Sequence, residues 1–504
     1  MSSQQHPLMM ASIMLSALVY TLDSTIAAVA LPQMQGSFSV TQDQIAWVLT
    51  SYIVTSAIFT PVAGYLATRF GQRNMFLVCV GGFTAASVMC GLSVNLEEMV
   101  FFRILQGMSG AALIPLSQAA ILHAYAPEDY GRGMALFGVG VMLGPIIGPT
   151  LGGWLTDVAD WRWVFLINLP VGLVAMLGIA LTIPRHESFE RPRRFDWLGF
   201  SFLGIAIGAL QLLLDRGNSQ GWFSSLEIQV EAFIACLFLY LFLAQTHLSD
   251  EPFVDLRIFK DWNFSVSILL SFTVGFNMMA TMAILPPFMQ SLLGYPVLIT
   301  GLIMAPRGIG TMVSMFMVSR LIMLVDARAL IITGLIMNAL SLWVMTSFDQ
   351  NVTPMMLMWT GVLQGFGMGL MFVPMSSVAF STIEARFRND CAAFYSLGRN
   401  FGSSVGVSVL MGALAVYVRE NRSHLIDHIN PFNPALTHGL PAMMDYRETS
   451  GLELLNQMVQ REALMLGYLD DFRLMTAISL ISIPFVMLLR VPRRQPARAA
   501  ASAA

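Results

Sequence analysis

Runs of mostly apolar residues, each long enough to cross a bilayer, recur from one end of the chain to the other and restrict its fold. A transmembrane helix needs about 20 such residues. Only 11% of the 504 residues are charged, whereas a soluble domain has about 25%. The sequence therefore predicts an all-α polytopic membrane protein. The fourteen predicted spans lie near residues 9–31, 46–67, 75–94, 98–122, 133–156, 163–183, 197–214, 229–247, 263–286, 297–320, 328–347, 354–376, 393–416 and 471–490.

Positive charges indicate how these spans are oriented, because short cytoplasmic loops are enriched in Lys and Arg. With the N-terminus inside, the inner loops contain Arg69, Arg73 and the arginine-rich stretch 185–194. The short outer loops contain only Arg162 and Arg216. The distribution predicts an even number of spans, with the N- and C-termini in the cytoplasm.

A repeated motif divides the spans into two halves. Gln106-Gly107 in the fourth span is followed by Pro115-Leu116-Ser117, and Gln364-Gly365 in the twelfth is followed by Pro374-Met375-Ser376. The two spans correspond if the seventh and eighth are an insertion between two six-span halves. Duplicated halves are typical of transporters, whose substrate site lies at the interface of the repeats near the membrane midplane. The alternative is chance similarity between two glycine-rich helices.

This division predicts the organisation of the chain. The N-terminal six-helix half covers residues 8–184, and the C-terminal six-helix half covers residues 261–490. The two inserted helices and their flanking loops lie between the halves at residues 185–260. A periplasmic loop at residues 417–470 belongs to the second half, and a cytoplasmic tail follows at residues 491–504.

Two charged residues, Asp23 and Arg103, lie well inside the predicted spans of the first half. A charge such as Asp23 in mid-membrane costs about 2.5–3.5 kcal/mol, so it needs a partner, water or a proton. A carboxylate that gains and loses a proton there can couple transport to a proton gradient; the alternative is a static carboxylate capped by Ser24 and Thr25. Arg103 cannot lose its proton. It either biases a nearby proton-binding carboxylate such as Asp23 or extends to the outer interface.

The sequence lacks the residues that several kinds of enzymatic or binding site require. The single lysine, Lys260, has no glycine spacing of a phosphate-binding loop before it, which excludes nucleotide hydrolysis by that route. The four cysteines show no metal-ligand spacing, and no basic patch suits nucleic acid. We therefore predict no enzymatic activity, no metal and no cofactor. The energy must come from an ion gradient, from a partner or from the gradient of the substrate.

The fifth predicted span has a stripe of small residues. Glycines recur there every four residues, which lets helix backbones approach closely, and a proline can bend the helix. One interpretation is a rocking contact between the two halves that seals against leak; the other is ordinary tight packing. The stripe consists of Gly140, Gly144, Gly148 and Gly152, with Pro145 beside it.

The loop between the second and third predicted spans combines glycine with arginine. Gly64 and Gly71 permit a tight turn, and Arg69 and Arg73 can cap helix ends at the cytoplasmic face. We predict that this loop takes part in gating. Simple marking of the topology by arginine is the alternative.

Several of these segments resemble known motifs. Residues 64–73 are similar to the loop 2–3 motif of the major facilitator superfamily, residues 103–107 to its span-four motif, and residues 140–153 to its span-five antiporter motif. Residues 22–25 and 161–168 resemble markers of its fourteen-span drug:proton antiporters. Three further segments are similar to those of the EmrB-type exporters, at residues 214–217, 222–225 and 430–434.

The resemblance implies the major facilitator fold with 14 transmembrane helices. It also implies a proton-coupled antiporter that exports amphipathic or hydrophobic drugs across a bacterial inner membrane, driven by the proton gradient without a cofactor. The implied partners are a periplasmic membrane-fusion adaptor and an outer-membrane channel. A gradient-driven transporter of one specific metabolite is the alternative. Thr68 departs from the pattern, because many superfamily members have aspartate there, and this weakens a charge-based gate.

Polar residues within the spans are candidates for a substrate cavity. The amides among them are equally suited to hold helices together, and for Arg399 an interfacial anchor is the favoured interpretation. A helix near residues 450–469 carries a leucine-rich face that requires a partner surface, either the outer mouth of the protein itself or the adaptor. The five cavity candidates are Thr25, Gln106, Asn277, Arg307 and Gln364.

Overall fold

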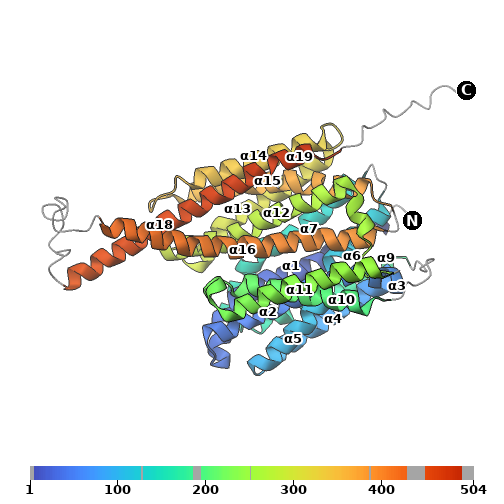
Figure 1. Ribbon diagram of the computed structural model, residues 1–504, viewed down its shortest axis with the longest axis horizontal. Helices are drawn as coiled ribbons and strands as arrows, with labels where there is room; N and C mark the ends of the chain where they lie inside the picture. Colours follow the sequence, from blue (N-terminus) through green and yellow to red (C-terminus); the bar gives the residue numbers. More distant parts are fainter. Residues whose placement is uncertain are drawn as a thin grey trace, which may run out of the picture.

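A computed structural model describes residues 5–125, 129–184, 195–249, 251–384, 387–427 and 449–490. Every regular element within these ranges is a helix, which confirms the predicted all-α fold (Figure 1). The segment at 430–434 and the predicted tail at 491–504 lie outside the described residues.

The first half is a bundle in which several spans are broken into two helices. The bend of 58° between α2 and α3 falls at Pro61, because proline cannot continue the hydrogen-bond ladder. The helices of this half are α1 (Gln5–Phe38), α2 (Gln42–Phe59), α3 (Val62–Phe70), α4 (Gln72–Leu92), α5 (Leu96–Gly110), α6 (Leu113–Ala124), α7 (Tyr130–Val158), α8 (Trp163–Leu166) and α9 (Asn168–Thr182).

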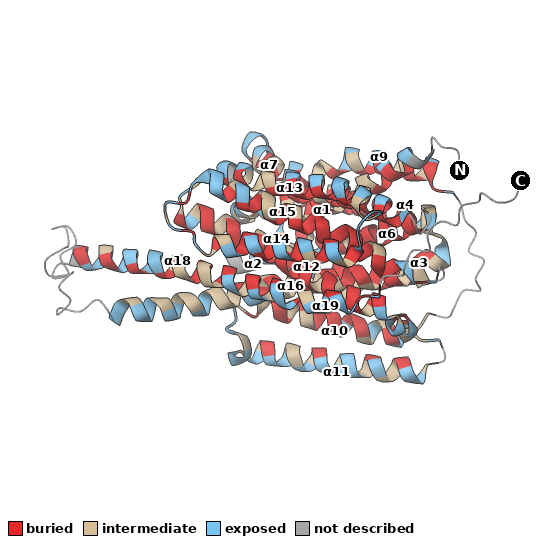
Figure 2. Ribbon diagram, turned by 90° about the horizontal axis from the view of Figure 1, so that it is seen from above, coloured by how far each residue is buried: buried red, intermediate tan, exposed pale blue. Residues whose placement is uncertain are grey.

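The inserted pair is α10 (Trp197–Arg216) and α11 (Leu226–Leu248), joined through the short helix η2 (Trp222–Ser224). The Asp196 side chain starts α10 by accepting a hydrogen bond from the Gly199 amide at 2.8 Å. α11 lies on the outside of the bundle and is exposed along much of its length (Figure 2). Its exposed residues include Phe233 and Tyr240, as expected of a helix that faces lipid.

The second half follows with a comparable set of helices. They are η3 (Leu256–Lys260), α12 (Trp262–Pro287), η4 (Phe288–Leu292), α13 (Val297–Leu321), α14 (Ala327–Met345), α15 (Pro354–Ser381), α16 (Arg388–Asp427), α18 (Thr449–Ile481) and α19 (Ile483–Met487).

By length and composition, twelve described helices can cross a membrane, and the bent pair α2–α3 makes thirteen. The C-terminal part of α18, continued by α19, completes the fourteen-span arrangement. It packs inside the second half, where Asn338 Nδ2 donates to Ser479 Oγ at 2.9 Å and Ser479 Oγ donates to Asn277 Oδ1 at 3.3 Å.

Helices α16 and α18 extend past the rest of the bundle as a pair (Figures 1 and 2). The sequence predicted a separate helix near 450–469 before the last span; instead α18 is one continuous helix from Thr449 to Ile481. Much of the leucine-rich face is buried between the two helices of the pair, where Leu455 and Val459 are buried. Arg422 Nη2 of α16 also donates to Asn456 Oδ1 of α18 at 3.0 Å.

Candidate functional site: a buried ion pair beside a cavity between the halves

Asp23 and Arg103 meet in the interior of the first half. Both side chains have 0% exposure, and Arg103 Nη1 lies 2.7 Å from Asp23 Oδ2. Gln106 Nε2 and Asn168 Nδ2 each donate to Asp23 Oδ1 at 2.8 Å. The carboxylate therefore accepts from three donors on two other spans. All three donors belong to the first half, as Asp23 does.

Arg103 has further contacts besides the carboxylate. Its Nε donates to the Val48 carbonyl at 2.9 Å, and its Cζ lies 4.1 Å from the centre of the Tyr52 ring. A buried ion pair persists only when geometry and further hydrogen bonds offset the desolvation of both charges. The structure thus rules out the interpretation of Arg103 as an arginine that extends to the interface.

Asn168 is a residue of this site that the sequence analysis did not single out. It begins α9 directly after the break that follows α8, and its Nδ2 also lies 2.9 Å from Ser87 Oγ. The Ser87 hydroxyl donates in turn to the Phe165 carbonyl at 2.9 Å. The only sequence signal was its position at the end of the 161–168 segment, since an asparagine near a span end has many other uses.

The hydroxyls next to Asp23 do not cap it. Ser24 Oγ donates to the Thr21 carbonyl at 2.9 Å. Thr25 Oγ1 bonds to the carbonyls of its own helix and to the Gly144 carbonyl at 3.3 Å. The carboxylate is held by side chains from other spans, so the alternative of a local hydroxyl cap is wrong.

A cavity of about 540 Å³ lies between the two halves. Tyr20, Thr25 and Tyr52 line it from the first half, and Phe372 and Arg399 line it from the second. Asp23 is not in its lining. The Tyr52 ring, which stacks on Arg103, also borders the cavity and is thus shared by the ion pair and the cavity wall.

Of the five cavity candidates, only Thr25 lines this cavity, and the expectation for the other four is corrected. Gln106 belongs to the Asp23 network, and Gln364 Nε2 donates to Thr281 Oγ1 at 3.0 Å. Asn277 accepts from Ser479, and Arg307 Nη2 donates to the Met278 carbonyl at 3.4 Å. The sequence gives the depth of a residue in the membrane but not the face of the bundle that it occupies.

Arg399 is the opposite case. It was expected at the interface, yet it has 7% exposure and lines the cavity, with its Cζ 5.7 Å from the Phe372 ring. Helix α16 begins at Arg388, well before the predicted start of the span at residue 393. Arg399 therefore lies about 16 Å into the helix at 1.5 Å per residue, too deep for an interfacial anchor.

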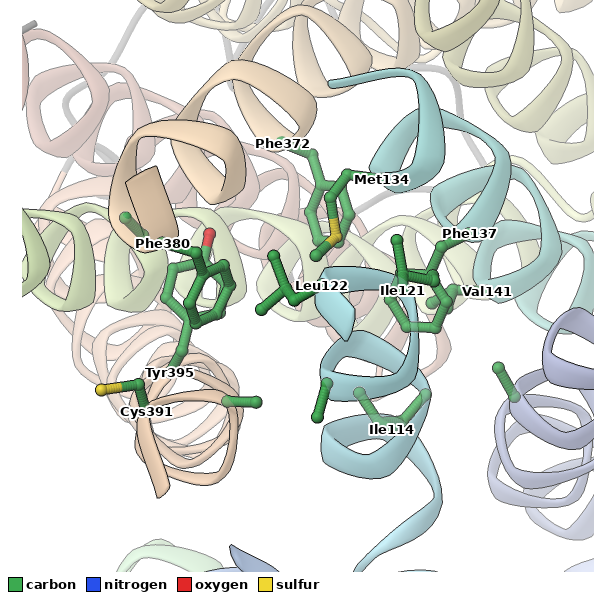
Figure 3. Packing of buried hydrophobic residues seen from close by; sticks show 14 of the residues in the cluster. Ile114, Ile121, Leu122, Met134, Phe137, Val141, Phe372, Phe380, Cys391 and Tyr395 are labelled. Atoms are coloured by element: carbon green, nitrogen blue, oxygen red, sulfur yellow. The ribbon is translucent and has the colours of Figure 1, made fainter. Parts of the chain in front are cut away.

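The halves are sealed together at the end of the bundle where the N-terminus lies (Figure 1). Figure 3 shows the apolar part of this seal, with Leu122 and Met134 of the first half facing Phe372, Phe380 and Tyr395 of the second. Polar contacts accompany it: Arg388 Nη1 donates to the Leu122 carbonyl at 2.9 Å, and Ser396 Oγ donates to Gln118 Oε1 at 3.1 Å. The cavity is closed on this side.

The loop 2–3 motif contributes to the same seal. A Cβ on Gly64 would clash with the Asp390 carboxylate and lie 2.9 Å from its Cα, so only glycine permits this approach. Asn389 Nδ2 donates to Thr68 Oγ1 at 3.4 Å, a contact between two neutral side chains. Gly71 has a φ of 82°, in the region that favours glycine.

The two arginines of the motif bond within the first half. Arg69 Nη1 donates to Tyr65 Oη at 2.8 Å. Arg73 Nη2 donates to the Ala180 carbonyl near the C-terminal end of α9, in the capping role that was expected.

The glycine stripe of α7 packs against α1. A Cβ on Gly144 would lie 2.6 Å from the Leu22 amide nitrogen, one on Gly152 would lie 2.8 Å from Ile26, and one on Gly140 would lie 2.9 Å from Met14. Gly148 is equally close to Thr25. The interpretation of this stripe as a contact between halves is therefore wrong. It positions α1, and with it Asp23, inside the first half.

The contact of α7 with the second half uses other residues. A Cβ on Gly138 would lie 2.7 Å from Met315 Sδ, and a Cβ on Gly308 of α13 would clash with Ile146. Pro145 lines the cavity between these two contacts. The face of α7 that meets the other half is thus about a quarter turn or more from its glycine stripe.

We expect Gly144→Val to destabilise the protein by about 1–3 kcal/mol, because its side chain must displace the α1 backbone. Gly153→Val is the matched control, since a Cβ on Gly153 meets no atom within 4 Å. Thermal unfolding of both purified variants in detergent measures the difference. Equal unfolding midpoints would contradict the close approach of α7 and α1.

Comparison with known proteins agrees with this geometry. The profile of the Major Facilitator Superfamily matches residues 13–250 and 267–419. The chain belongs to the Major Facilitator Superfamily. Within this superfamily, it is similar to the multidrug export protein EmrB of Escherichia coli K12, with 31% identity over 97% of this chain and 98% of that protein. It is also similar to the fatty acid resistance protein FarB of Neisseria gonorrhoeae, with 30% identity over 95% of each chain.

Solved structures of superfamily members show the same fold at low sequence identity. The human organic anion transporter MFSD10 aligns with a TM-score of 0.63 at 14% identity, covering 95% of this chain and 99% of that one. The proton:xylose symporter XylE aligns with a TM-score of 0.63 at 13% identity, covering 97% of this chain and 96% of that one. The titles of these two proteins name different substrates, so the fold alone does not decide what is transported or in which direction.

Proposed function

We propose that this protein is a proton-coupled antiporter that exports amphipathic or hydrophobic toxic compounds across a bacterial inner membrane, with both termini in the cytoplasm. The observation that carries the proposal is a buried Asp23–Arg103 pair whose arginine stacks on Tyr52, a residue of the cavity wall. The names of the relatives, multidrug export and fatty acid resistance, support export as the direction.

The geometry suggests how proton binding acts on the cavity. A proton on Asp23 removes the negative charge that Arg103 faces, and an unpaired buried guanidinium is strongly unfavourable. Arg103 must then shift or gain another partner, and Tyr52 must move with it because the two groups stack at 4.1 Å. Loading of the proton site and the shape of the cavity are therefore linked through Tyr52. No cofactor is required, since the proton gradient supplies the energy.

The proposal is tested with the full chain reconstituted in liposomes that have an acidic lumen. Antiport predicts that an amphipathic dye accumulates in the lumen only while the pH gradient lasts. A transporter of one specific metabolite, the second candidate function, would leave a panel of unrelated dyes untransported. That result would overturn the proposed drug export.

We further propose that the protein works with a periplasmic adaptor and an outer-membrane channel. The support is the α16–α18 pair, which extends beyond the bundle and keeps apolar side chains exposed on α18, namely Leu452 at 50% and Met458 at 51%. Exposed apolar residues on an extended helix are suited to docking another protein.

We expect the double substitution Leu452→Glu and Met458→Glu to remove drug resistance in whole cells and to leave dye transport in liposomes unchanged. Drug resistance in a strain that lacks the wild-type gene gives the first measurement, and liposome transport gives the second. Glu462→Gln on the same exposed helix is the control. Full resistance of the double variant would refute docking at these two residues.

A further inference from the structure

The inserted helix α10 forms part of the cavity wall. It is hydrogen-bonded to the second half on this side, where Gln211 Nε2 donates to Ser404 Oγ at 2.8 Å and Ser408 Oγ donates to the Leu214 carbonyl at 2.6 Å. It is also bonded to the first half, since the Thr50 hydroxyl donates to the Asp215 carboxylate. The cavity therefore has three walls, and one of them comes from the inserted pair.

Arg399 brings a positive charge to the cavity that the protein does not neutralise. Within the described ranges, no carboxylate lies within 4.0 Å of its guanidinium, and no hydrogen bond from that guanidinium to a protein atom is found. The side chain is nevertheless 93% buried, as its exposure is 7%. A guanidinium stays charged and a buried charge is costly without a partner, so this group is available to an anionic group of a ligand.

Asp215 brings a negative charge to the same cavity from α10. Its neighbour Arg216 pairs with Glu227 instead, and Asp215 forms no ion pair with any basic group in the described part of the chain. Thr50 donates to one oxygen of the carboxylate, and Asp215 is an exposed residue of the cavity lining. This arrangement leaves the carboxylate available to a cationic group of a ligand.

The two charges lie at different levels of the cavity. Arg399 precedes Ser408 by nine positions on α16, about 13 Å along the helix axis at 1.5 Å per residue. Ser408 bonds to Leu214, the residue directly before Asp215. Apolar side chains such as Met278 and Val407 also line the cavity. Its volume of about 540 Å³ lies in the range of drug-sized sites.

We propose that the cavity holds its substrate between Arg399 and Asp215, and so selects amphipathic molecules that carry an acidic group at one end and a basic group at the other. The acidic group binds Arg399, and the basic group binds Asp215 on the inserted helix. This inference rests on the proposed function, to which it adds the chemical class of the preferred substrate and a role for the inserted pair in recognition.

The experiment measures binding of four matched probes to the purified full-length protein in nanodiscs. The probes are ω-aminoundecanoic acid, its methyl ester, its N-acetyl derivative and the doubly blocked molecule. We expect the zwitterion to bind about tenfold or more tightly than the doubly blocked form, with both singly charged forms between them. Arg399→Gln should abolish the preference for a free acid, and Asp215→Asn should abolish the preference for a free amine.

Controls separate recognition from folding. Arg399→Lys retains the charge and should retain the preference for the acid. Asp160→Asn, which changes an exposed carboxylate outside the cavity lining, should change neither preference. Equal affinity of the wild type for all four probes, or an equal loss for all four in Arg399→Gln, would overturn the inference. Dye transport driven by the pH gradient, measured on the same preparations, would still stand in that case. Loss of that transport in the wild type would instead overturn the proposed function.

Discussion

Asp23→Asn is expected to abolish the accumulation of dye that the pH gradient drives, with the initial rate reduced about tenfold or more, equivalent to about 1.4 kcal/mol or more. Asparagine retains an oxygen that can accept from Arg103, Gln106 or Asn168, but it cannot carry the exchangeable proton. The measurement compares wild type and variant in liposomes with an acidic lumen. Dye binding in detergent is measured alongside and should persist, because Asp23 does not line the cavity, with an affinity that reflects the cavity shape set by an uncharged site through Tyr52.

Asp160→Asn is the matched control for this experiment, since that carboxylate lies in an exposed loop and pairs with Arg162. It should transport at the wild-type rate. Gradient-driven transport that survives Asp23→Asn would place proton coupling at another residue. A complete loss of dye binding would mean that the carboxylate is required for the structure of the cavity, and the loss of transport would then not locate the proton step.

Arg103→Gln is expected to cost about 3–5 kcal/mol of stability, because removal of one partner leaves the other charge buried without compensation. Arg103 also forms the hydrogen bond to the Val48 carbonyl and the stack on Tyr52, so the substitution disturbs the cavity wall as well. Thermal unfolding in detergent measures the loss. The double variant Asp23→Asn with Arg103→Gln should recover a large part of it, since no buried charge remains.

The double-mutant cycle makes this prediction specific to the pair. If the two residues interact as the distance of 2.7 Å indicates, the effects of the single substitutions will not add. Additive effects would show that each side chain is stabilised independently of the other. Even with its stability recovered, the double variant should not couple dye movement to the proton gradient, because both charges of the proton site are absent.

The charged residues show how far sequence reasoning reaches. Asp23 and Arg103 were found from the chain alone, because a charge inside an apolar run is expensive and must have a use. Asn168 was missed, because it lies near the predicted start of the sixth span, where an asparagine has many other uses. Arg399 was found but placed at the interface, since the true start of α16 at Arg388 depends on contacts with the other half.

The glycines show the same limit in another form. The spacing of Gly140, Gly144, Gly148 and Gly152 predicted close helix packing, which the structure confirms. The spacing did not identify the partner, which is α1 of the same half and not the opposite half. A stripe of small residues specifies a smooth surface, and the surface that meets it is set by how all the other helices pack.

The sequence by itself determined the class of the protein and singled out Asp23 and Arg103, the two charges that the structure pairs. A charge inside an apolar run is costly in a membrane, so a charged residue within a predicted span can be recognised from the sequence. Only the tertiary structure decided which residues share a wall. Arg399 and Asp215 lie on separate helices, and they line one cavity because α10 bonds to both halves. The depth of a residue in the membrane follows from its position in the chain, whereas the direction of its side chain within the bundle follows from the packing of many helices at once.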